Sequence, residues 1–73
     1  MFLCDAEKNR KFRIIRIDLK DREKARLWEL GVTAGTVAEK ESSPRFGAAV
    51  ISAGGTRIAI GREAASGIRI EYV

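Results

Sequence analysis

Apolar and polar residues alternate along several short stretches of this chain, which is the pattern of half-buried β-strands. In the first stretch, residues 11 to 19, Phe12 and Ile14 occupy alternate positions. A second apolar row then starts at Ile15 and runs to Leu19 on the opposite phase. A strand that changes its inward face needs a bulge or a sharp bend. The pattern therefore favours a small barrel over a flat sheet.

The segment from Asp21 to Leu30 is rich in residues that favour helices. Asp21 is the expected N-cap of this helix, and Gly31 is the expected left-handed residue that ends it. Leu27 and Leu30 are three residues apart, so they share one helical face. Because a helix this short is marginal in water, we expect both leucines to dock it on the barrel, with Val32 folding back onto them.

Two β-prone runs, residues 47 to 53 and 56 to 60, flank the pair Gly54-Gly55. This arrangement predicts a hairpin with a two-residue turn, in which Ile51 faces Ile58 and Ile60 on the other arm. The remaining predicted elements are a polar strand at 35–41, a short helical turn at 61–67 and a final strand at 68–73. The expected fold is mainly β, with about five antiparallel strands and one short inserted α-helix.

The chain is short, with 73 residues, so we expect one domain that spans residues 1 to 73. Small domains of this size often gain stability from a partner subunit, and a homo-oligomer is therefore considered. The first residues become charged too early for a signal peptide or a membrane helix, which predicts a cytoplasmic protein.

The composition argues against catalysis and against a resident metal or cofactor. The chain has no histidine and one cysteine, Cys4, so it cannot build a thiolate or imidazole metal site or an internal disulfide. No second group is placed to activate Cys4 as a nucleophile, and the glycines lack the pattern of a phosphate-binding loop. The carboxylates are spaced as solvated side chains, and this includes both clusters considered as candidate metal sites. These clusters are Asp18, Asp21 and Glu23, and Glu39 and Glu41.

The charge balance leaves a nucleic-acid function open as an alternative. The chain carries 14 basic and 10 acidic residues, which gives a net charge of +4. Basic residues that face phosphates gain affinity by releasing counterions. However, acidic residues follow soon after the basic ones, and few aromatic residues are available to stack on bases. We therefore favour a solvated barrel face over a face that binds RNA or DNA.

The order of these elements resembles the FeoA family. The string LWELGVTAGT, residues 27 to 36, is similar to the segment of that family that joins the helix to the next strand. Residues 43 to 71 are similar to its closing half, from the proline-led loop to the final apolar strand. Family members commonly carry proline where Ala34 and Ala48 stand, and glycine where Asn9 precedes the first strand. The resemblance implies an SH3-like barrel.

The resemblance also implies a function. FeoA proteins are accessory proteins of bacterial ferrous iron uptake, thought to dock on the cytosolic part of the FeoB transporter and to modulate it. On this basis we expect a protein that is not an enzyme and that acts through protein–protein interaction. RNA or DNA binding by a basic barrel stays as the alternative.

Candidate partner-binding residues lie on the helix and at the tip of the proline-led loop that follows the predicted strand 35–41. Trp28 is offset by about 100° from Leu27, so it lies beside the apolar stripe that also contains Leu30. One interpretation makes Trp28 a partial core residue. The other makes Trp28 and Leu27 the lining of an apolar groove that accepts a partner segment. Arg45 and Phe46 are candidates for a second contact.

Overall fold

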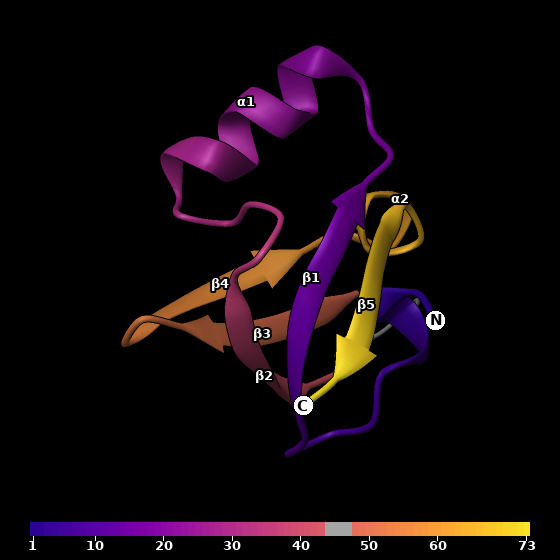
Figure 1. Ribbon diagram of the computed structural model, residues 1–73, viewed down its shortest axis with the longest axis vertical. Coiled ribbons are helices and arrows are strands. Elements are labelled where there is room, and N and C mark those ends of the chain that lie inside the picture. The colour runs from indigo at the N-terminus through magenta and orange to yellow at the C-terminus, as the bar shows by residue number, and fades with distance from the viewer. Residues whose placement is uncertain (44–47) are drawn as a thin grey trace.

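In a computed structural model, the chain forms one antiparallel sheet of five strands in the order β4-β3-β2-β1-β5 (Figure 1). The structure describes residues 1–43 and 48–73. The strands are β1 (Lys11–Ile17), β2 (Val37–Ser42), β3 (Ala49–Ala53), β4 (Thr56–Ile60) and β5 (Ile68–Tyr72). The helices are α1 (Asp21–Glu29), α2 (Arg62–Ala65) and a short 3-10 helix, η1 (Leu3–Asp5). The prediction of a mainly β fold with one inserted α-helix is confirmed.

The predicted change of face in β1 is a real bulge. Phe12 and Ile14 are fully buried in the core. The register between β1 and β5 then shifts between Ile14 and Arg16, and Ile15 lies on the exposed side. Figure 1 shows β3 and β4 running across the direction of β1 and β5, as expected for a sheet that curls on itself.

The predicted hairpin is also confirmed. Gly54 and Gly55 both have positive φ, at 58° and 81°, which is the conformation of a two-residue turn that suits the twist of the flanking strands. Ile51 of β3 lies opposite Ile58 of β4, and both side chains are buried. The glycines therefore fix the register that brings the apolar faces of both arms into the core.

The segment before β1 contributes to the core, which the sequence pattern does not predict. Leu3 in η1 is fully buried. The backbone carbonyl of Met1 accepts a hydrogen bond from the N–H of Ile70 at 2.8 Å, and Phe2 forms a bridge with Arg69. The first residues of the chain thus extend the edge of β5.

Lys40 in β2 is a buried cation that holds this segment. Its side chain is only 2% exposed. The Nζ atom donates to the backbone carbonyl of Ala6 at 2.9 Å and approaches those of Leu3 and Cys4 at 3.5 Å. An ammonium group buried among carbonyl oxygens is satisfied without a carboxylate. Lys40 therefore joins β2 to the end of η1.

Helix α1 differs from the prediction at its start. Lys20, not Asp21, occupies the N-cap position, and no side chain caps the helix there. The backbone carbonyl of Lys20 accepts the first helical hydrogen bond, from the N–H of Lys24 at 2.9 Å. Asp21 lies in the first turn, where its negative charge interacts favourably with the helix dipole and stabilises the helix.

The other end of α1 corrects the role expected for Leu30. Gly31 has a φ of 86°, as predicted, and the turn that it makes brings Val32 back into the core. The N–H of Val32 donates to the carbonyl of Leu27 at 2.9 Å, and both side chains are buried. Leu30, by contrast, is 50% exposed. The turn lets Val32 take the place in the core that Leu30 was expected to fill.

Among residues 1–43 and 48–73, no helix has the length and apolar character needed to cross a membrane.

The backbone conformation of Asn9, in the turn before β1, can be tested by substitution. It has a φ of 65°, a left-handed conformation that asparagine tolerates better than most residues. Replacing Asn9 with alanine is therefore expected to lower the free energy of unfolding by about 1 kcal/mol, whereas glycine at the same position is expected to change it by less than about 0.5 kcal/mol. Urea unfolding of the two variants would measure the difference. Equal losses in both variants would contradict this account.

Candidate functional site: a groove beside the helix

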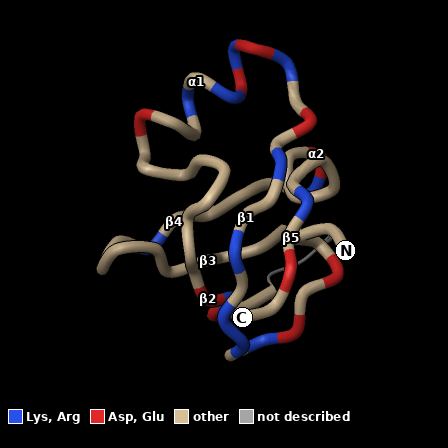
Figure 2. The backbone as a smooth tube through the Cα atoms, in the orientation of Figure 1, with Lys and Arg blue, Asp and Glu red and all other residues tan. Residues whose placement is uncertain are grey.

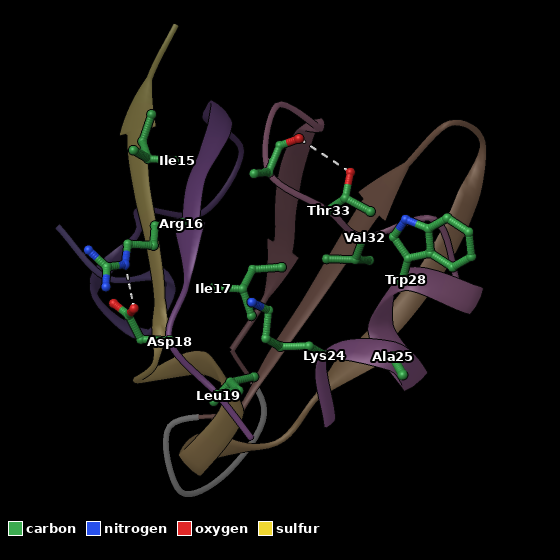
Figure 3. A pocket seen from close by; sticks show the side chains of 11 residues that line it. Ile15, Arg16, Ile17, Asp18, Leu19, Lys24, Ala25, Trp28, Val32 and Thr33 are labelled. Atoms are coloured by element: carbon green, nitrogen blue, oxygen red, sulfur yellow. Dashed lines mark hydrogen bonds and ion pairs between the residues drawn. The ribbon is translucent and has the colours of Figure 1, made fainter. Parts of the chain in front are cut away.

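The side of α1 that faces the end of β1 forms an open groove, which we call the helix groove (Figure 3). Its volume is about 630 Å³. The floor comes from β1 and the residues after it, one wall comes from α1, and the turn after α1 closes one end. The groove lies between β1 and α1, which follow each other in the chain and are joined by a short link that ends at Lys20. Residues close together in the sequence therefore form it.

The floor of the helix groove is the second apolar row of the first stretch. Ile15, Ile17 and Leu19 all line it. Ile17 and Leu19 are partly buried against the core, whereas Ile15 is exposed. The bulge in β1 therefore has a consequence for the surface, because the residues after it line the helix groove while Phe12 and Ile14 fill the barrel interior.

The wall of the helix groove contains Trp28, and this corrects one of the two predictions for that residue. Trp28 is 70% exposed, so it is not a partial core residue. Figure 3 shows its indole beside Val32, which also lines the groove. Leu27, expected to line the same groove, is buried and does not do so. Trp28 and Leu27 therefore face different sides of the helix.

The helix groove carries an excess of positive charge. Two of its charged residues, Arg16 and Asp18, form an ion pair through Nε and Oδ1 at 2.5 Å (Figure 3). The third, Lys24, has no ion pair within the described part of the chain. An apolar floor beside one unneutralised ammonium group suits an apolar segment that carries a negative charge.

A second groove lies on the other side of α1, between this helix and the segment from β4 to α2. Its volume is about 830 Å³, and Leu27 and Leu30 contribute to its lining. The structure therefore separates the predicted binding residues, because Trp28 lines the helix groove and the two leucines line the second groove. The remaining two candidates, Arg45 and Phe46, lie outside the described residues.

The comparison with protein families decides the identity of the fold. The sequence matches the FeoA domain over residues 1–72, which is nearly the whole chain. The chain belongs to the FeoA family. Membership of this family supports a role in a ferrous iron transport system. No curated protein matches the sequence significantly.

Solved FeoA structures share the architecture. FeoA from Chlorobium tepidum has a TM-score of 0.92 and 18% identity, and the match covers 100% of this chain and 70% of that protein. The iron(II) transport protein A from Clostridium thermocellum has a TM-score of 0.91 and 23% identity, covering 100% and 46%. A FeoA-like protein from Clostridium acetobutylicum has a TM-score of 0.84 and 19% identity, covering 100% and 86%. At these identities the likeness concerns the fold, and it confirms the SH3-like barrel.

The basic residues of this FeoA protein are interspersed with acidic ones, as the sequence indicated (Figure 2). Several arginines are paired with carboxylates across or along the strands. Arg13 lies 3.6 Å from Glu71, and Arg57 lies 3.4 Å from Glu41. Because these pairs neutralise part of the basic surface, they do not favour the nucleic-acid alternative.

The described residues of this FeoA protein bring no three of its cysteine, aspartate and glutamate side chains together in a way that could hold a metal ion. Asp18, Asp21 and Glu23, the group of three carboxylates considered from the sequence, are thus not gathered into such a cluster. One of their members, Asp18, is instead engaged with Arg16.

Proposed function

We propose that this FeoA protein is a non-catalytic accessory protein of bacterial ferrous iron uptake. As a single domain spanning residues 1 to 73, it docks in the cytoplasm on the cytosolic part of a FeoB-type transporter and modulates that transporter. Family membership supports the link to ferrous iron transport. The helix groove supports the docking mode, because it offers an apolar surface that the barrel itself does not fill.

The observation that carries this proposal is the exposure of Trp28 on the wall of the helix groove. A large aromatic side chain left in water gains free energy when a partner covers it, and tryptophan is enriched among the residues that dominate interface energies. The apolar floor would accept an apolar side chain of the transporter, and Lys24 would face an acidic group beside it.

Trp28 is the only tryptophan of the chain, so its indole N–H gives one assignable resonance in the ¹⁵N-labelled protein. We would titrate this protein with the unlabelled cytosolic part of its cognate transporter at physiological salt. The expected result is a saturable shift of the indole resonance together with the amides of Ile15 and Thr33, which line the same groove. If these signals do not move at a large excess of the transporter domain, the proposal is wrong.

Replacing Trp28 with alanine is expected to weaken this binding about tenfold or more, because the substitution removes the largest apolar surface of the helix groove. Leu30→Ala is the matched control, since Leu30 is also exposed near the end of α1 but lines the second groove. Isothermal titration calorimetry would compare the two variants with the unchanged protein. Similar affinities for both variants would argue against Trp28 as the anchor.

A further inference from the structure

The second groove carries four charged residues that the docking proposal does not use. Glu23 and Arg26 lie on the wall formed by α1, and Arg62 and Glu63 lie on the opposite wall formed by α2. None of the four has an ion pair within the described part of the chain. Each wall of the groove therefore presents one free acidic and one free basic side chain.

These four charges sum to zero, although the whole chain has a net charge of +4. This net charge makes two copies of the protein repel each other, because like charges oppose association. The second groove has no net charge, so it adds nothing to that repulsion. It also exposes half of Leu30, beside Ala59 of β4, so that apolar surface is available between the charged walls.

The shape of this region is suited to a twofold axis. Figure 1 shows that helix α1 projects from the strands. The second groove lies beside this helix, because four residues from α1 and the position after it line the groove. In a twofold interface, the same surface is used by both subunits, so every contact occurs twice. A ridge next to a groove is complementary to its own copy, because each ridge enters the groove of the other molecule.

We propose that the second groove is a self-association surface whose occupant is α1 of a second copy of this chain. Glu23 of each copy faces Arg62 of the other, and Arg26 faces Glu63, which gives four ion pairs across the axis. The two Leu30 side chains lie in the groove between them. The charge arrangement favours a second copy over a strongly acidic or basic partner, because either kind would leave two of the four charges opposed by like charge.

The interface is independent of the helix groove, which lies on the other side of α1 and stays open in the dimer. Binding to a transporter and self-association can therefore be tested separately. The contacts are exposed ion pairs around two half-exposed leucines, so we expect a weak association that is populated between about 0.1 and 1 mM and weakens as salt is raised.

A charge-swap experiment tests this inference on the chain alone. Glu23→Arg and Arg62→Glu each place like charges opposite each other twice in their own dimer. Mixed together, however, the two variants restore an opposite-charge contact at both positions. Sedimentation equilibrium would measure association of the unchanged protein, of each variant alone and of the equimolar mixture. Lys8→Glu is the net-charge control for Arg62→Glu, because both substitutions lower the net charge by two and Lys8 is exposed and lines neither groove.

The expected result is association of the unchanged protein and of Lys8→Glu, about tenfold weaker association of each variant alone, and recovery in the mixture to within about threefold of the unchanged protein. Recovery excludes misfolding as the cause of the loss, since a misfolded variant could not be rescued by mixing. A protein that stays monomeric up to 1 mM by this measurement, or a mixture that recovers nothing, would overturn the inference.

Discussion

Replacing Lys40 with methionine is expected to lower the free energy of unfolding by about 3 kcal/mol. Methionine keeps the length and apolar stem of lysine but removes the donor that reaches the carbonyls of Leu3, Cys4 and Ala6. These carbonyls then lose a charged hydrogen-bond donor at a site that is largely buried. For a domain of this size, such a loss is a large part of the total stability.

Urea unfolding monitored by circular dichroism would measure the effect of Lys40→Met. The matched control is Lys8→Met, which changes the net charge equally at an exposed position. Hydrogen exchange adds a local readout, because the N–H of Ile70, which donates to Met1, is expected to lose protection in Lys40→Met alone. Equal midpoints for the two methionine variants would show that the buried ammonium group contributes no stability.

Replacing Gly67 with alanine is expected to lower the free energy of unfolding by about 2 kcal/mol. A Cβ atom at this position would lie 2.6 Å from the Cδ2 atom of Leu19 and 2.9 Å from the backbone carbonyl oxygen of Asp18. The backbone there cannot yield easily, because the N–H of Asp18 donates to the carbonyl of Gly67 at 2.7 Å. Leu19 also forms part of the floor of the helix groove, so the substitution disturbs the groove as well as the barrel.

Gly61→Ala is the control for Gly67→Ala, because a Cβ atom at Gly61 meets no atom within 4 Å and its backbone is extended. Both substitutions remove the same flexibility from the unfolded chain, so their difference isolates the steric clash. Thermal unfolding of the two variants would provide the comparison. A melting temperature for Gly67→Ala equal to that of Gly61→Ala would mean that Leu19 and Asp18 move aside without loss.

Local signals in the sequence were sufficient for most of the sheet. The change of apolar phase after Ile14 predicted the bulge in β1, and the pair Gly54-Gly55 predicted the hairpin. The segment before β1 was not predicted to join the core, because it has neither alternation nor helical periodicity. Leu3 is buried because hydrogen bonds from Lys40 and from the edge of β5 fix this segment against the barrel. Such contacts between distant residues leave no local pattern.

The candidate site was only partly predictable. The second apolar row, from Ile15 to Leu19, was recognised as a change of face, but the same pattern did not reveal that it would line a groove. The exposure of Trp28 could not be derived either, because a short helix with two leucines leaves open which neighbouring side faces the barrel. Val32 decides this orientation by entering the core after the turn at Gly31.

The order of the strands also sets a condition on how the protein is made. Strand β1 lies between β2 and β5, so β1 cannot be paired on both sides until β5 has been made. During translation, a nascent chain that lacks residues 68 to 72 leaves one side of β1 without its partner and Ile14 without Ile70 beside it. Barrel closure is therefore expected as a cooperative event governed by distant contacts, which follows the synthesis of residues 68 to 72.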